Sequence, residues 1–138
     1  LGLANSLAGG SGLLTLGGNT LDITAGASIA NLVTVADGAT ISSSTGGGTL
    51  TNAQVLTLAA GPSTLKLSGS ADDALVVARN LVGAAGDPQQ VEVTGGRVTL
   101  AGSNGQDSTR VTTASGSTLG LANSLAAGAA VGGWPGFF

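Results

Sequence analysis

The chain has 138 residues with no Cys and no His, and charged residues make up only 8% of it, giving a net charge of −3. These absences exclude disulfide frameworks, Ser-His-Asp and Cys-His catalysis and the ordinary zinc sites. The four basic residues are scattered among seven acidic ones. Because nucleic acids are bound by clustered Lys and Arg, we expect no nucleic-acid partner.

One phrase occurs near both ends of the sequence. Residues 1–8 read LGLANSLA, and the same letters recur at residues 119–126. An exact internal repeat is typical of modules taken from an array. We therefore expect four segments: a closing phrase of a preceding repeat (1–10), a β-rich sub-domain (11–68), a strand–helix–hairpin–strand module (69–126) and an aromatic tail (127–138).

The first half of the chain alternates apolar and polar residues. Leu14/Leu16, Val33/Val35 and Leu65/Leu67 each enclose one Thr or Lys. A period of two predicts short, half-buried strands, and Gly-rich stretches such as 46–48 predict turns between them. Residues 13–68 are also similar to the rungs of secreted β-solenoid adhesins.

The pattern changes after residue 69. Ser70 is a good helix N-cap, Asp73 follows three positions later as in an approximate capping box, and Gly83 can end a helix. Leu75, Ala78 and Val82 would share one face. The sequence therefore predicts one helix near residues 71–82.

A hairpin is expected next. Residues 91–94 and 97–100 alternate, and Gly95-Gly96 between them suits a tight type I′ turn. In that register Val91 and Leu100 face each other on the apolar side, and Glu92 and Arg97 lie on the opposite side. The fold class predicted for the whole chain is a β-rich α+β fold with short antiparallel strands and hairpins, one helix near 71–82, and a first half like a β-solenoid.

The second half resembles a known small module. Residues 62–122 include TLKLSGSADDALVVARNLVGAAGDPQQVEVTGGRVTLAGSNGQDSTRVTTASGSTLGL. The order of strand, helix, Gly-Gly hairpin, strand and closing LGL is similar to the flagellin IN motif of flagellins, filament-cap proteins and phage tail proteins. The resemblance implies an outer decoration domain or a tail-fibre module.

No residue pattern indicates catalysis. The acidic residues form no recognisable pair for hydrolysis, so we predict a non-enzymatic protein without catalytic or cofactor-binding residues. The loop at 104–108 is rich in oxygen ligands, which makes Asp107 a candidate for calcium. An ordinary turn between strands explains the same loop, and we expect no resident cofactor.

The aromatic residues all lie at the end of the sequence. Trp134, Phe137 and Phe138 follow a Gly-rich stretch, and aromatic side chains are frequent anchors of interfaces. We predict that these three residues form an interface. Pro135 would stiffen the segment between them.

These features predict a structural or interaction module of an extracellular bacterial filament or phage tail, assembling through strand edges and termini. The alternative is a repeat of a secreted β-solenoid adhesin that binds a surface or a glycan. Expected partners are further copies or neighbouring subunits, or a host surface or glycan. The expected location is extracellular, at the cell surface or on a virion. No stretch of about 20 predominantly apolar residues predicts a membrane span.

Overall fold

The computed structural model describes residues 1–6, 10–60, 62–83, 89–103 and 110–123, and these residues form strands and turns with no helix. The strands belong to three sheets. The six-stranded sheet contains β1 (Gly2–Leu3), β3 (Thr20–Ile23), β6 (Thr40–Ser42), β9 (Ser63–Ser68), β12 (Gln89–Gly95) and β14 (Arg110–Thr113). The five-stranded sheet contains β4 (Ala27–Ile29), β7 (Gly48–Leu50), β10 (Leu75–Val77), β13 (Arg97–Leu100) and β15 (Thr118–Leu121). The four-stranded sheet contains β2 (Leu14–Leu16), β5 (Val33–Val35), β8 (Leu56–Thr57) and β11 (Leu81–Val82).

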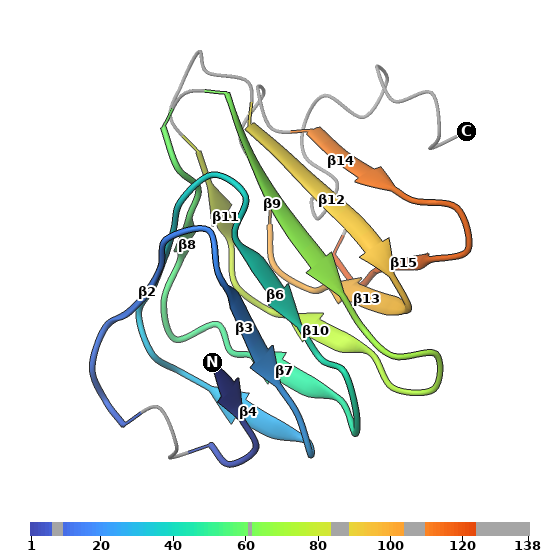
Figure 1. Cartoon of the computed structure of the whole chain (residues 1–138), viewed down its shortest axis with the longest axis horizontal. Coiled ribbons are helices and arrows are strands. Elements are labelled where there is room, and N and C mark those ends of the chain that lie inside the picture. Colours follow the sequence, from blue (N-terminus) through green and yellow to red (C-terminus); the bar gives the residue numbers. More distant parts are fainter. Residues whose placement is uncertain (7–9, 61, 84–88, 104–109, 124–138) are drawn as a thin grey trace.

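The chain visits the three sheets in turn and then returns to the first (Figure 1). The rungs in chain order are β1 with β2, β3–β5, β6–β8, β9–β11, β12 with β13, and β14 with β15. Neighbouring rungs pair in parallel, as Leu21 with Ile41 and Ile41 with Leu67 illustrate. The described chain is therefore a three-sided parallel β-solenoid.

The alternation of residues explains each side of the solenoid. Side chains alternate between inward and outward along each strand. In Val33-Thr34-Val35 both Val are buried, whereas in β6 the middle residue, Ile41, is the buried one. Leu, Ile and Val from all three sheets form one aliphatic core. Because the inward positions are mostly apolar and the outward positions mostly carry hydroxyl groups, a slip of one residue would expose the apolar set and bury the hydroxyl groups.

The prediction of antiparallel strands is wrong, because every strand pair in the described residues is parallel. Alternation shows that a segment is a strand but not which strand it pairs with. The Gly-rich stretches turn the chain onto the next side of the solenoid instead of reversing it. At residues 13–68 the strands form a continuous parallel coil, and this coil goes on through the strands of the later rungs.

The predicted helix near 71–82 is also wrong. These residues form a turn followed by β10 and β11. Ser70 does make the contact expected of a cap, because its Oγ accepts the Asp73 N–H at 2.9 Å, but the bond closes a turn between β9 and β10. The ladders of β10 with β7 and β13 satisfy the backbone that a helix would otherwise satisfy internally.

The predicted Gly-Gly hairpin is wrong for a related reason. β12 pairs with β9 and β14, whereas β13 pairs with β10 and β15. The turn at Gly96, whose φ is +60°, is a corner between two sheets. Val91 and Leu100 do point into the same core, but from different sheets. Glu92 lies opposite Lys66, and Arg97 lies opposite Thr118.

The two copies of the LGLANSLA phrase occupy different positions in the solenoid. In the first copy Leu3 is in β1 and pairs with Ile23 in the six-stranded sheet. In the second copy Leu121 is in β15 and pairs with Leu100 in the five-stranded sheet. Leu3 is buried, whereas Leu121 is exposed, so the same letters serve a core position in one copy and an exposed position in the other.

The division of the chain at residues 68 and 69 stays a prediction. Strands before and after this point pair in all three sheets: β6 with β9, β7 with β10 and β8 with β11.

Candidate functional site

The outward side chains form columns of hydroxyl groups. On the four-stranded sheet Thr15, Thr34 and Thr57 occupy successive rungs, and the Thr34 hydroxyl donates to that of Thr15 at 3.4 Å. The five-stranded sheet carries a similar column: Ser28, Thr49, Val76 and Thr99. The six-stranded sheet carries Thr20, Thr40, Lys66, Glu92 and Thr112. The faces are therefore largely uncharged and rich in hydrogen-bonding groups.

Asp22 is the centre of a polar cluster on the outer surface. Its Oδ1 accepts hydrogen bonds from the Ser42 hydroxyl and the Ser44 N–H, both at 2.9 Å, and its Oδ2 accepts one from the Ser44 hydroxyl at 2.6 Å. Burial raises the pKa of this carboxyl, but the hydrogen bonds from Ser44 and Ser42 and the nearby amino group of Leu1 outweigh it and hold the pKa below its ordinary value. Because the carboxylate is already occupied by donors that connect two rungs, we assign it a structural role.

Arg79 lies inside the solenoid, with 1% of its surface exposed. Its Nε donates to the Thr51 carbonyl oxygen at 2.7 Å, and its Nη2 donates to the Ile29 carbonyl oxygen at 3.2 Å. Within the described part of the chain, Nη1 and the nearby Thr51 hydroxyl have no hydrogen-bond partner. Burial lowers the pKa of Arg79. A guanidinium here joins three successive rungs at the corner between the five- and four-stranded sheets.

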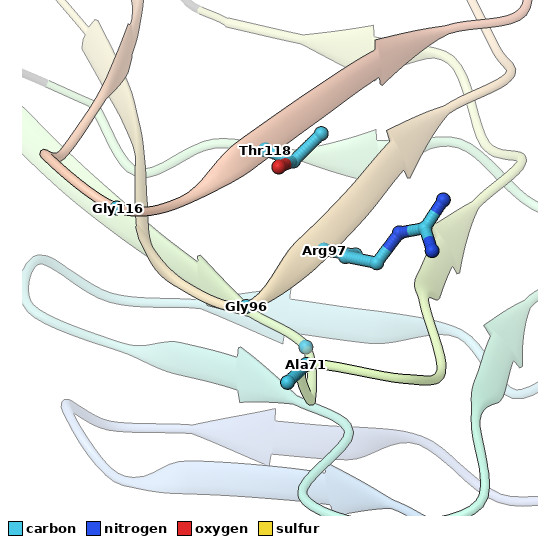
Figure 2. Close-up of a pocket in the computed structure, with 6 residues that line it drawn as sticks. Ala71, Gly96, Arg97, Gly116 and Thr118 are labelled. Carbon is cyan, nitrogen blue, oxygen red and sulfur yellow. The ribbon is translucent and has the colours of Figure 1, made fainter.

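A hollow of about 540 Å³ lies at the corner between the six- and five-stranded sheets. Figure 2 shows Arg97 and Thr118 side by side on adjacent strands, with Gly96 and Gly116 at the corner and Ala71 in the neighbouring loop. The side chain of Arg97 points away from both glycines. The residues lining the hollow supply one cation and one hydroxyl group but no general base, so this arrangement offers no catalytic pair.

Two further hollows follow the corner between the five- and four-stranded sheets. One has a volume of about 520 Å³ and the other about 440 Å³, and Gln54 lines both. We call them together the corner groove. The described residues of its lining are carboxamides, small residues and exposed aliphatic side chains, and none of them is charged. Asn52 and Gln54 are exposed, whereas the buried Asn31 donates to the carbonyl oxygens of Gly10 and Gly12.

The residues predicted to form sites lie outside the described part of the chain. This applies to the calcium candidate Asp107 and to the interface residues Trp134, Phe137 and Phe138. In the described ranges no three acidic side chains come close enough to hold a metal ion. Calcium binding at Asp107 and an interface at the three aromatic residues stay predictions.

Sequence reasoning missed Arg79 and the corner groove. The sequence did contain a signal for Arg79, because Leu75, Val77, Arg79 and Leu81 occupy every second position of one segment. In the structure all four side chains are buried. The groove had no such signal, since its two sides come from loops on different rungs.

No described helix is long and apolar enough to cross a membrane. The fold and its outer surface define the chain as a parallel β-solenoid with mostly uncharged faces. No protein-family model, curated protein or solved structure matches it.

Proposed function

We propose that the chain is a non-enzymatic segment of an extracellular β-solenoid adhesin, which binds a surface or a glycan through its outer faces. The observation that supports this proposal is the register of the three sheets. Parallel pairing keeps outward positions in register from rung to rung, so the faces present ordered columns such as Thr15, Thr34 and Thr57.

The core supports a rigid, elongated unit. Each rung donates backbone hydrogen bonds to its neighbours and buries its apolar side chains in one continuous cluster. Parallel strands lie about 4.8 Å apart, so each added rung extends the solenoid by that distance without changing its cross-section. Such a geometry suits a stalk that holds binding faces away from a cell.

The outer chemistry favours neutral partners. Hydroxyl and carboxamide groups donate and accept hydrogen bonds, as the hydroxyl groups of carbohydrates also do. Three of the four basic residues lie on separate strands: Lys66 on β9, Arg97 on β13 and Arg110 on β14. They therefore do not form a basic cluster in the described part of the chain. This surface is a poor match for polyanions.

The resemblance to flagellin modules stays a prediction, and the proposed function does not depend on it. The helix and the hairpin on which it rested are absent from the described residues between 62 and 122.

The proposal can be tested by adhesion. Beads coated with the purified chain are counted after washing on epithelial cell layers and on plates coated with yeast mannan. We expect retention on at least one of these surfaces, and we expect Thr34→Asp with Thr57→Asp to reduce it without loss of the strand signal in circular dichroism.

The control beads carry Ile41→Asp, which places a charge in the core and should unfold the solenoid. Equal retention of wild-type and Ile41→Asp beads on every surface would show that the folded faces do not mediate adhesion.

A further inference from the structure

Three exposed aliphatic side chains form a column at the start of the four-stranded sheet. Leu13, Leu32 and Val55 are 56%, 43% and 44% exposed. The pairing of Leu14 with Val33 places Leu13 beside Leu32, and the pairing of Thr34 with Thr57 places Leu32 near Val55 on the next rung. We call these three residues the aliphatic column.

The aliphatic column lies along the corner groove. Leu13 and Leu32 line the hollow of about 440 Å³, and Val55 lines the hollow of about 520 Å³. An exposed apolar patch with a polar rim is typical of a contact surface. Because the described residues that line the two hollows are all uncharged, an uncharged and apolar occupant fits best.

One segment of this chain has that chemistry. Residues 124–138 read SLAAGAAVGGWPGFF, which contains no charged residue and every aromatic residue of the sequence. The segment follows directly after Asn123, and Asn123 lines the same groove. We propose that the aromatic end of this segment, with Trp134, Phe137 and Phe138, docks on the aliphatic column of its own chain.

The distances allow this docking. Asn123 belongs to the last rung, and the aliphatic column spans rungs three to five positions earlier, which corresponds to roughly 15–25 Å along the solenoid at about 4.8 Å per rung. Residues 124–134, at about 3.3 Å per residue when extended, reach roughly 35 Å. The aromatic rings would cover the aliphatic side chains, and the exposed carboxamides of Asn52 and Gln54 would face the backbone of the segment. This inference does not depend on the proposed adhesin function.

Trp134 is the only Trp of the chain and therefore reports directly on docking. In the full chain we expect blue-shifted Trp emission and protection from acrylamide quenching. In Leu32→Asp with Val55→Asp the ratio of docked to undocked segment should fall by roughly tenfold or more, because the rings would then have to bury charged groups. Emission should shift to the red and quenching should increase. Leu121→Asp is the matched control, since Leu121 is 38% exposed and lines neither hollow.

A second measurement does not depend on the Asp variants folding. The chain has no Cys, so Val55→Cys introduces a single site for a nitroxide label, which quenches Trp fluorescence at short range. Thr118→Cys with the same label is the control. We expect strong quenching from position 55 and little from position 118, equally at low and high protein concentration.

Three outcomes would overturn the proposal. Trp134 could be fully accessible to acrylamide in the unmodified chain, or the labels at positions 55 and 118 could quench it equally. Quenching from position 55 that appears only at high protein concentration, together with a dimer mass, would show that the segment docks on a second copy instead.

Discussion

The Nε of Arg79 donates a 2.7 Å hydrogen bond to the Thr51 carbonyl oxygen, one rung away inside the solenoid. Together with the bond from Nη2 to Ile29, it gives one side chain partners on two other rungs. The Ile29 carbonyl oxygen also accepts the Thr51 N–H at 2.9 Å, so Arg79 adds a second donor there and supplies a side-chain donor to the Thr51 carbonyl oxygen.

We expect Arg79→Ala to lower the free energy of unfolding by about 2–5 kcal/mol, because the carbonyl groups of Thr51 and Ile29 each lose one donor and the long buried side chain leaves a cavity. Urea unfolding followed by circular dichroism measures this change. Arg97→Ala is the control, since Arg97 is exposed, and it should change stability by less than about 0.5 kcal/mol. Equal effects of the two substitutions would contradict the role assigned to Arg79.

The Asp22 cluster predicts a dependence of stability on pH. The folded state holds the pKa of Asp22 below its ordinary value, so the ionised carboxylate stabilises the fold at pH values above the pKa of the unfolded chain. This contribution is lost as the pH falls through the folded-state pKa. Asp22→Asn should cost about 1–2 kcal/mol at neutral pH and little at acidic pH, where the wild-type carboxyl is also neutral. The measurement is the urea midpoint as a function of pH, with the exposed Asp72→Asn as the control; a difference independent of pH would speak against the cluster.

The corner at Gly96 predicts that alanine substitutions at two neighbouring glycines have very different effects on stability. Gly96 has a φ of +60°, and a Cβ there would overlap the carbonyl oxygen of Gly69. Gly96→Ala should therefore destabilise the protein by about 2 kcal/mol or more, whereas Gly95→Ala, which meets open space, should cost less than about 1 kcal/mol. Thermal unfolding of the two variants tests this, and similar melting temperatures would show that the corner can relax.

The turn after β9 predicts that removing the Ser70 hydroxyl lowers stability modestly without changing the secondary structure. The Ser70 hydroxyl accepts from the Asp73 N–H and donates to the Asp73 carbonyl oxygen at 3.0 Å. Ser70→Ala should cost about 1 kcal/mol. Far-ultraviolet circular dichroism of both proteins should show a strand spectrum, and a helical signal that weakens in Ser70→Ala would instead support a helix at 71–82.

The region around Arg79 shows how far the sequence could be interpreted. Ser70 and Asp73 suggested a helix start, and Leu75, Ala78 and Val82 fit a helical face. The residues that are buried are Leu75, Val77, Arg79 and Leu81, which alternate as in a strand. A buried arginine was not expected at an inward position, because charged residues are seldom fully buried. The alternating positions were present in the sequence, but the charge of Arg79 made one of them look unsuitable for the inside of a strand.

The corner groove was less predictable from the sequence. Leu13, Leu32 and Val55 are far apart in the sequence, and only the parallel register places them on successive rungs. An alternating pattern does not specify how many residues each corner holds. This number determines which side chains become neighbours on successive rungs.

The sequence by itself determined the short strands with inward Leu, Ile and Val in residues 13–68 and at 91–94 and 97–100, since alternation is a local property of the backbone. It also determined that no His or Cys chemistry is available. Only the tertiary structure decided that these strands pair in parallel on three sides, that Gly96 makes a corner and not a hairpin, and that Ser70 closes a turn and not a helix. The reason is physical: the same local hydrogen bonds and apolar spacing are compatible with several folds, and the stacking of rungs satisfies the backbone and buries the aliphatic side chains together.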